Sequence, residues 1–274
     1  MSGILDHIRD SYYSLTASEQ KVASYVMENA DAVQFMSISE LAELSGVADA
    51  TVTRFCHNLE FKGFNTFKIE IAKSLGTSDT DTSEDMSDIC ALVAKETREA
   101  VDESVAMLSK EAIFRAVEIL EGAERVMCYG VGGSMLLAME FAHIFSSVST
   151  KFTAVSDQHM QLSFVSTMKE CDAVVIFSYS GATKAGMELL EFVKRLGIKA
   201  IIITRFAVSP MARLCDVVLC CGSKQGPYQM GSVPSRIAQL VVSDVLFREY
   251  VARNKEESEE NIRKIAAALS DKHI

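Results

Sequence analysis

The sequence predicts an all-α helix-turn-helix domain followed by an α/β three-layer sandwich with a five-stranded parallel sheet. Before residue 77, apolar residues recur with helical spacing and proline is absent. From residue 89 onward, helical stretches alternate with short β-branched apolar runs, as in parallel α/β folds. Between them, residues 77–88 contain five acidic residues, no basic ones and one large apolar side chain, Met86. We therefore expect domains at 1–76 and 89–274, joined by an acidic linker at 77–88.

Capping residues mark the expected helices of the first domain. Thr16 and Glu19 are spaced as in a capping box, in which each side chain binds the backbone amide of the other residue. The segment SISELAELSG predicts a second helix that Ser39 caps, with Leu41 and Leu44 facing the core. These signals predict two consecutive helices before residue 46.

A short turn that begins at Gly46 leads to a third expected helix, DATVTRFCHNL. In this helix Val52, Phe55 and Leu59 recur at i, i+3 and i+7 and form a buried stripe. Two helices joined by such a glycine-containing turn form a helix-turn-helix, whose second helix fits the major groove of DNA. The residues expected to contact DNA lie opposite this stripe or just after the helix: Thr51, Thr53, Arg54, His57, Asn58, Lys62 and Lys68. A plain helical bundle with a solvated face is the alternative that spacing alone leaves open.

The segment SISELAELSGVADATVTRFCHNLEFKGFNTFKIEIA resembles the helix-turn-helix of the RpiR-type bacterial transcriptional regulators. This resemblance implies operator DNA as a partner. Some positions depart from the usual pattern of the family. Ala48 stands in place of a serine, His57 and Asn58 in place of a basic pair, and Glu60 in place of a glycine. Asp49 is therefore expected to cap the third helix, and the expected DNA face has lost positive charge.

Five apolar runs in the second domain predict the strands of a parallel sheet, because strands buried on both faces are apolar at successive positions. The runs are RVMCYG (125–130), KFTAV (151–155), DAVVIFSYS (172–180), KAIIIT (199–204) and DVVLCCG (216–222). The intervals between them are long enough for crossover helices or loops. Ligands of such sheets bind beyond the carboxyl ends of the strands, near the point where the strand order reverses.

Two of the expected strand ends are rich in glycine and in hydroxyl side chains. They read GVGGS (130–134) and SYSGAT (178–183). Glycine lets backbone amides approach a ligand closely, and the amino terminus of a following helix favours an anion. Hydroxyl groups can bind both phosphate oxygens and sugar hydroxyls. Such a combination suits a phosphorylated sugar.

Three other interpretations of these two loops are a Walker loop, a dinucleotide-binding fingerprint and simple helix caps. A Walker loop requires Gly-Lys-Ser/Thr after the glycine turn, and the sequence has none there. A dinucleotide-binding fingerprint requires glycine where the bulky Met135 stands. The simplest alternative is that the serines only cap the helices that follow.

The second domain resembles the SIS domain, the sugar-isomerase fold that binds phosphosugars. Four segments show the resemblance: GVGGS (130–134), SYSGATK (178–184), IIITRFAVSPMARLCDVVL (201–219) and SRIAQLVVSDVLF (235–247). It implies a phosphosugar pocket formed by Ser134, Ser178, Ser180 and Thr183 and shaped by Gly132, Gly133 and Gly181. The two resemblances occur in the order that defines the RpiR-type regulators.

SIS-type enzymes need a general acid or base near the sugar carbons. The candidates here are Glu140, His143 and His159. His143 lies in an apolar helical run and is expected to be a packing residue, whereas His159 follows the second strand and could hydrogen-bond a ligand. Because neither histidine has a visible catalytic partner, we interpret the domain as a sensor rather than an enzyme.

Composition bounds the remaining expectations. No run approaches the ~20 apolar residues of a membrane span, and no secretion signal is visible, so we expect a cytoplasmic protein with no membrane partner. Seven scattered cysteines without a Cys-x-x-Cys pair predict buried free thiols and no metal site. No cofactor is expected. The net charge of −10 restricts any DNA contact to a local basic face.

The sequence thus predicts a DNA-binding transcriptional regulator of carbohydrate metabolism whose SIS domain senses a sugar phosphate. A homodimer or homotetramer is expected, with subunit contacts from the apolar faces of residues 234–251 and 262–269. One alternative is a phosphosugar isomerase or lyase with an accessory helical domain. Another is a SIS protein whose helical domain has lost its affinity for DNA.

Overall fold

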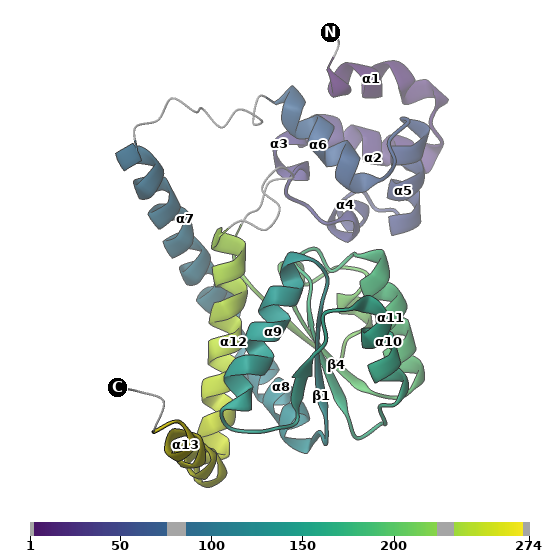
Figure 1. Ribbon diagram of the computed structural model, residues 1–274. Helices are drawn as coiled ribbons and strands as arrows, with labels where there is room; N and C mark the ends of the chain where they lie inside the picture. Colours follow the sequence, from purple (N-terminus) through teal and green to yellow (C-terminus); the bar gives the residue numbers. More distant parts are fainter. Residues whose placement is uncertain (1–2, 76–85, 224–232, 271–274) are drawn as a thin grey trace. The chain divides into compact units, whose positions relative to one another are not determined.

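The computed structural model describes residues 3–75, 86–223 and 233–270, which form two compact units (Figure 1). The boundary between the units falls after Lys95. This residue lies within the long helix α7, Met86–Met107, so the helix contributes residues to both units. Residues 77–85 of the expected acidic linker lie outside the described residues.

The first unit is helical. Its elements are α1 (Ile4–Ser11), η1 (Tyr12–Ser14), α2 (Ala17–Glu28), α3 (Ala30–Val33), α4 (Ile38–Leu44), α5 (Asp49–Asn58) and α6 (Phe64–Ser74). Phe55 of α5 and Phe67 of α6 are fully buried, and their ring centroids are 5.5 Å apart in an edge-to-face arrangement. These rings join the apolar residues of the other helices in one core, which confirms the predicted all-α domain.

Capping bonds explain where α2 and α4 begin. Thr16 and Glu19 form the predicted capping box, and the Thr16 amide donates to Glu19 Oε2 over 2.9 Å. The predicted cap of α4 is wrong by two residues, because Ser37 accepts the bond from the Glu40 amide. Ser39 instead lies buried in α4 and donates to Asp49 Oδ2 over 2.5 Å. Asp49 is therefore the first residue of α5 rather than its cap.

The turn between α4 and α5 has the geometry of a helix-turn-helix. Gly46 has a left-handed φ of 64°, and the amides of Gly46 and Val47 bind the carbonyls of Glu43 and Ala42. This pattern ends α4 and turns the chain directly into α5. Leu44 was expected in the core, but it is 55% exposed because it lies in the last turn of α4, at the surface.

The second unit contains the predicted five-stranded parallel sheet. Its strands are β1 (Val126–Gly130), β2 (Phe152–Ala154), β3 (Ala173–Phe177), β4 (Lys199–Thr204) and β5 (Val217–Cys220), in the order β2-β1-β3-β4-β5. All neighbouring pairs are parallel. The chain proceeds from β1 to β2 on one side and from β3 to β5 on the other, so the strand order reverses between β1 and β3.

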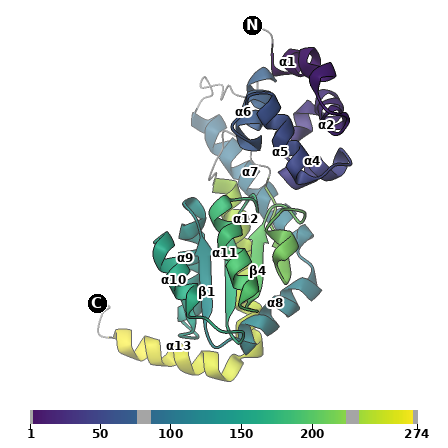
Figure 2. The ribbon, with the colours of Figure 1, turned by 90° about the vertical axis from the view of Figure 1, so that its right-hand side faces the viewer.

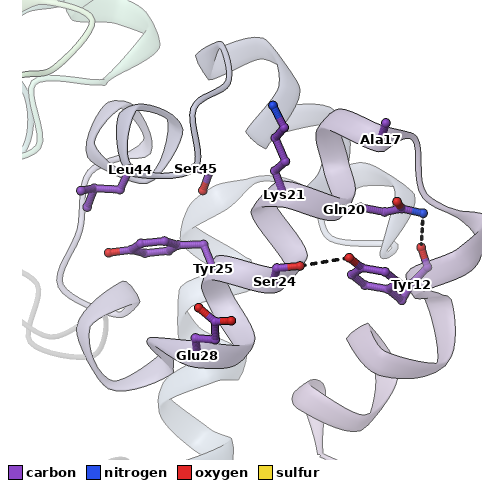
Figure 3. Close-up of a pocket in the computed structure, with 9 residues that line it drawn as sticks. All are labelled: Tyr12, Ala17, Gln20, Lys21, Ser24, Tyr25, Glu28, Leu44 and Ser45. Carbon is purple, nitrogen blue, oxygen red and sulfur yellow. Dashed lines mark hydrogen bonds between the residues drawn. The ribbon is translucent and has the colours of Figure 1, made fainter.

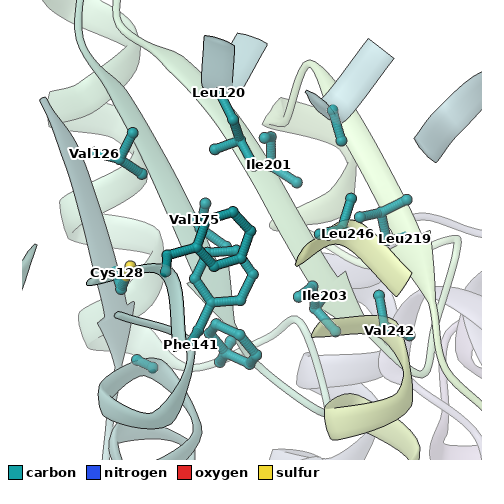
Figure 4. Close-up of a cluster of buried hydrophobic side chains, with 14 of the residues drawn as sticks. Leu120, Val126, Cys128, Phe141, Val175, Ile201, Ile203, Leu219, Val242 and Leu246 are labelled. Carbon is teal, nitrogen blue, oxygen red and sulfur yellow. The ribbon is translucent and has the colours of Figure 1, made fainter. Parts of the chain in front are cut away.

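Helices cover both faces of this sheet and complete the predicted three-layer sandwich (Figure 2). The helices that follow α7 are, in chain order, α8 (Lys110–Gly122), α9 (Gly133–Ser146), α10 (Gln158–Ser166), α11 (Lys184–Arg195), η2 (Ala212–Leu214), α12 (Val233–Arg253) and α13 (Lys255–Leu269). Side chains from α8, α9 and α12 pack on one face of the sheet, where Phe141, Val175 and Leu246 belong to the same buried cluster (Figure 4). Side chains from α10 and α11 pack on the other face.

The two segments expected to join subunits differ in their packing. Helix α12 contacts α8, α9 and β4, and its buried residues, such as Val242 and Leu246, belong to the core of its own unit. These residues of α12 are therefore used within the chain. On α13, by contrast, Ile262, Ile265 and Leu269 are exposed.

All seven cysteines are free. Cys56, Cys128 and Cys221 are buried as predicted, and burial raises the pKa of the Cys56 thiol to about 12. Cys90 and Cys171 are exposed, which contradicts the expectation for those two. Among the described residues, no helix has both the length and the apolar composition needed to cross a lipid bilayer.

Candidate functional sites

The two glycine-containing loops lie at the switch point of the sheet. One follows β1 and the other follows β3, and these strands are hydrogen-bonded neighbours. Gly130, the last residue of β1, is in register with Phe177, the last residue of β3. Residues 130–134 and 178–183 therefore leave adjacent carboxyl ends of the sheet, as the sequence predicted.

The first loop brings the backbone close to the start of α9. A Cβ atom at Gly130 would overlap the carbonyl group of Ser134, so this position requires glycine. Gly132 has a left-handed φ of 58° and caps α9, which begins at Gly133. Ser134 is half-buried in the first turn of this helix. The loop thus presents a helix amino terminus with one hydroxyl group in its first turn.

The second loop is organised by its own hydroxyl groups. The buried Ser178 Oγ accepts a bond from the Gly181 amide over 3.2 Å, and Ser180 Oγ accepts one from the Ala182 amide over 3.3 Å. A hydroxyl that accepts a bond from an amide still has its own hydrogen to donate. Ser178 and Ser180 can therefore both shape the loop and donate to a phosphate oxygen.

Thr183 and Gly181 complete this loop. Thr183 is exposed at the N-cap of α11 and makes no side-chain cap bond. The simple capping alternative therefore does not explain this threonine. Gly181 has a left-handed φ of 58°, and a Cβ atom there would overlap the Ser209 hydroxyl. Glycine is thus needed at this position for both backbone conformation and space.

His159 lies beside a cavity that these hydroxyl groups do not line. It is exposed on α10 and borders a cavity of 640 Å³ between α10 and α11. None of the other predicted ligand residues lines this cavity. His143 was expected to pack in the core, but it is exposed on α9.

Sequence reasoning missed two buried residues that line the same cavity. Gln161 donates to the carbonyl of Gly130 over 3.2 Å and to that of Val155 over 2.8 Å, so it holds the start of the first loop. Tyr129, on β1, has a pKa raised to about 12 by burial and by the nearby Glu188. Neither residue had a sequence signal. Tyr129 directly precedes the GVGGS motif, Gln161 lies outside both motifs, and both have apolar neighbours in the sequence.

The expected DNA-binding residues of α5 divide into two groups. Thr53, Arg54, His57 and Asn58 are exposed or half-exposed, as predicted. Thr51 was expected on this face, but it is only 6% exposed, and its Oγ1 accepts a bond from Arg54 over 3.1 Å. The reason is that α5 packs against α2, α4 and α6 and so buries a wider face than a single stripe.

Two further contacts restrict the polar residues. The Asn58 amide group donates to Glu19 Oε1 over 2.8 Å, which ties the end of α5 to α2. The Lys68 ammonium was expected to contact DNA, but it is half-buried and donates to the Met36 carbonyl over 3.0 Å. Burial lowers the pKa of Lys68 to about 8, partly opposed by Glu40. Lys68 is therefore a packing residue, whereas Lys62 remains exposed.

A separate hollow of 420 Å³ lies in the first unit beside α2 (Figure 3). Gln20 donates to the Tyr12 carbonyl over 3.1 Å, and the hydroxyls of Tyr12 and Ser24 are 3.1 Å apart. These bonds connect η1 to α2. None of the predicted DNA-binding residues lines it.

Comparisons with known proteins agree with both parts of the architecture. Residues 2–78 match the helix-turn-helix domain of the rpiR family, and residues 119–248 match the SIS domain. An HTH-type transcriptional regulator of Caldanaerobacter subterraneus is 36% identical over 255 residues, which cover 90% of each chain. The HTH-type transcriptional regulator HexR of Escherichia coli is 26% identical over 274 residues, covering 98% of this chain and 94% of HexR.

A solved structure has the same fold throughout. The Vibrio vulnificus NanR protein, complexed with ManNAc-6P, superimposes with a TM-score of 0.90 and 24% identity, covering 99% of each chain. The relatives are named as transcriptional regulators, which agrees with a regulator rather than an isomerase. The chain belongs to the rpiR family of helix-turn-helix transcriptional regulators and combines the DNA-binding domain of that family with a SIS domain.

Proposed function

We propose that the SIS domain of this regulator binds a sugar phosphate between its two glycine-containing loops and thereby controls operator binding by the helix-turn-helix. The observation that supports this most strongly is the placement of residues 130–134 and 178–183 at adjacent strand ends of the switch point. Each loop leads into the amino terminus of a helix, α9 or α11. Two such termini attract one anion, and the surrounding hydroxyls suit both phosphate and sugar oxygens.

The proposed ligand contacts follow from the geometry of each residue. Ser178 and Ser180 donate their hydroxyl hydrogens to the phosphate while they keep their bonds to the loop amides. Thr183 and Ser134 add one hydroxyl each from the first turns of α11 and α9. The ManNAc-6P complex of NanR supports a phosphosugar as the ligand class.

The same proposal includes DNA, oligomer and location. The DNA-contacting set is the exposed part of the predicted face, namely Thr53, Arg54, His57, Asn58 and Lys62. Operator half-sites related by two-fold symmetry require a dimer, for which the exposed Ile262, Ile265 and Leu269 of α13 are available as an apolar contact. A regulator of genes for sugar metabolism acts in the cytoplasm.

A panel of sugar phosphates in a thermal-shift assay tests the ligand. A true ligand at a hundredfold excess over its dissociation constant adds ~2.7 kcal/mol to the free energy of unfolding, and the matching unphosphorylated sugar should add none. The Ser180→Ala variant should weaken binding ~10-fold or more, because it removes one hydroxyl donor to a charged group.

The matched control is Ser163→Ala on α10, whose hydroxyl donates to the His159 carbonyl beside the 640 Å³ cavity. It should leave the thermal shift unchanged. A shift that persists in Ser180→Ala but disappears in Ser163→Ala would place the ligand between α10 and α11 instead. Conversion of aldose to ketose phosphate by the purified protein would favour the isomerase alternative.

A further inference from the structure

Helix α7 is the element through which the SIS unit continues toward the DNA-binding unit. The helix runs without interruption from Met86 to Met107, and the boundary between the units falls within it, after Lys95. The half of α7 that belongs to the SIS unit and the half that precedes the boundary are therefore parts of one continuous helix. The contacts that this half makes near the predicted ligand loops are the ones that matter for control.

The end of β5 packs directly on the backbone of α7. A Cβ atom at Gly222 would overlap Glu103 Cβ and would lie 2.7 Å from the Ser104 amide nitrogen and 2.9 Å from the Ala100 carbonyl oxygen. The buried Ser104 hydroxyl accepts a bond from the Gly222 amide over 2.9 Å. No side chain separates the two backbones, so α7 cannot shift here without moving the residues after β5.

Both backbone polar groups of Ser223, the next residue, are hydrogen-bonded. Its amide donates to Glu103 Oε2 of α7 over 3.1 Å. Its carbonyl accepts from the Tyr179 hydroxyl over 2.9 Å. Ser223 also has a left-handed φ of 88°, which is unfavourable for a residue with a side chain and persists only where contacts enforce it.

Tyr179 belongs to the second ligand loop, between Ser178 and Ser180. Its carbonyl accepts bonds from the Arg205 amide over 3.1 Å and from the Thr204 hydroxyl over 3.0 Å, both at the end of β4. The backbone of Tyr179 is thus anchored on the sheet, while its side chain reaches Ser223. One residue of the loop at 178–183 is thus bonded both to β4 and to the segment after β5.

We propose that the hydrogen-bond chain from Tyr179 through Ser223 to Glu103 couples ligand binding at the second loop to the position of α7. This inference rests on the proposed function, because it requires a sugar phosphate that binds at residues 178–183. Binding at the loop shifts the Tyr179 hydroxyl, which either keeps or releases Ser223 in its unfavourable conformation. Ser223 and Gly222 then determine the position of α7 through their bonds to Glu103 and Ser104.

A thermodynamic cycle on the full-length protein tests the chain. The probes are a sugar phosphate identified in the thermal-shift panel and a DNA fragment captured by the wild-type protein from genomic DNA. The dissociation constant for DNA is measured with and without saturating sugar phosphate. In the wild type the two constants should differ by ~5- to 150-fold, the usual range for coupled sites.

Tyr179→Phe removes only the hydroxyl that binds Ser223. We expect its coupling, the ratio of the DNA dissociation constants with and without saturating sugar phosphate, to fall ~2- to 10-fold, the contribution of one hydrogen bond. Glu103→Ala should have the same effect, whereas Glu103→Gln keeps an acceptor for the Ser223 amide and should retain most of the coupling. Tyr129→Phe is the matched control, because Tyr129 lines the cavity between α10 and α11 and takes no part in the bonds to Ser223.

The outcomes separate the two proposals. Full wild-type coupling in Tyr179→Phe would overturn the hydrogen-bond chain and leave the proposed function intact. A wild-type protein whose DNA affinity is indifferent to every sugar phosphate would overturn the proposed function and the chain with it. Equal loss of coupling in Tyr129→Phe and Tyr179→Phe would also contradict the chain, because it would show a general effect of removing hydroxyls near the sheet.

Discussion

Replacement of the two lysines that follow α5, Lys62 and Lys68, should affect DNA binding differently. Lys62 is exposed in the short connection between α5 and α6, where its ammonium group is available to a phosphate. The Lys68 ammonium is 3.0 Å from the Met36 carbonyl oxygen and 5.3 Å from the centre of the Phe64 ring. We predict that Lys62→Ala weakens DNA binding and that Lys68→Met does not.

The expected magnitude follows from counterion release. Each phosphate contact contributes ~0.9 to the slope of log K against log salt concentration. Loss of the Lys62 contact should therefore flatten the slope by ~0.9, so that raising the salt from ~50 to ~200 mM weakens the variant ~3.5-fold less than the wild type. Lys68→Met should keep the full slope.

Fluorescence anisotropy of a captured DNA fragment, measured at four or more salt concentrations, gives both slopes. Far-UV circular dichroism of each variant checks that the helices are retained. A flattened slope in Lys68→Met with a full slope in Lys62→Ala would refute this prediction, because the half-buried amine would then be the one that contacts DNA.

Three further predictions concern stability and the ligand loop. Because the pKa of Lys68 falls from its ordinary 10.5 to about 8, the unfolded chain binds more protons between these values, so stability should rise with pH across this window in urea titrations and rise less in Lys68→Met. Glu60 follows α5 with a φ of 65°, where a side chain costs ~1–2 kcal/mol, so Glu60→Gly should raise the free energy of unfolding by ~0.5–1 kcal/mol, and a lowered midpoint would contradict this. Gly181→Ala should reduce sugar-phosphate affinity at least ~10-fold in isothermal titration, because its Cβ overlaps Ser209 and the loop must move, and unchanged affinity would exclude this loop from the site.

The sheet could be predicted from the sequence because its three central strands, β1, β3 and β4, are buried on both faces. Runs such as Ala173–Phe177 and Lys199–Thr204 are apolar at nearly every position, which is typical of central parallel strands and not of surface helices. The glycine and hydroxyl residues after two of the runs then indicated which strand ends lie at the switch point. Strand ends were predicted to within three residues: β4 has the predicted bounds, whereas the run predicted for β3 extends three residues past Phe177.

The DNA face was predicted less well, because it depends on how helices pack. Thr51 is buried because α5 contacts three other helices, and Lys68 is half-buried beside the fully buried Phe67. Helical spacing predicts one apolar stripe, and it does not show how many partners a helix has. Ser37 and Ser39 illustrate the same limit, since both suit an N-cap and only the packing against Asp49 distinguishes them.

The departure at Glu60 shows where a sequence pattern did carry structural information. The residue after Leu59 adopts a left-handed conformation, and the amides of Glu60 and Phe61 bind the carbonyls of His57 and Cys56. Gly46 closes α4 in the same way with a φ of 64°. The backbone geometry therefore explains why the usual family pattern has glycine at position 60. The glutamate in this chain adopts a strained conformation, which the rest of the turn must offset.

The most direct test of the account is a crystal structure of the protein with a sugar phosphate found in the thermal-shift panel. We expect phosphate oxygens within ~3 Å of the Ser178, Ser180 and Thr183 hydroxyls, with the sugar ring lying toward Ser134. Density for the phosphate between α10 and α11, or at any place away from the ends of β1 and β3, would contradict it.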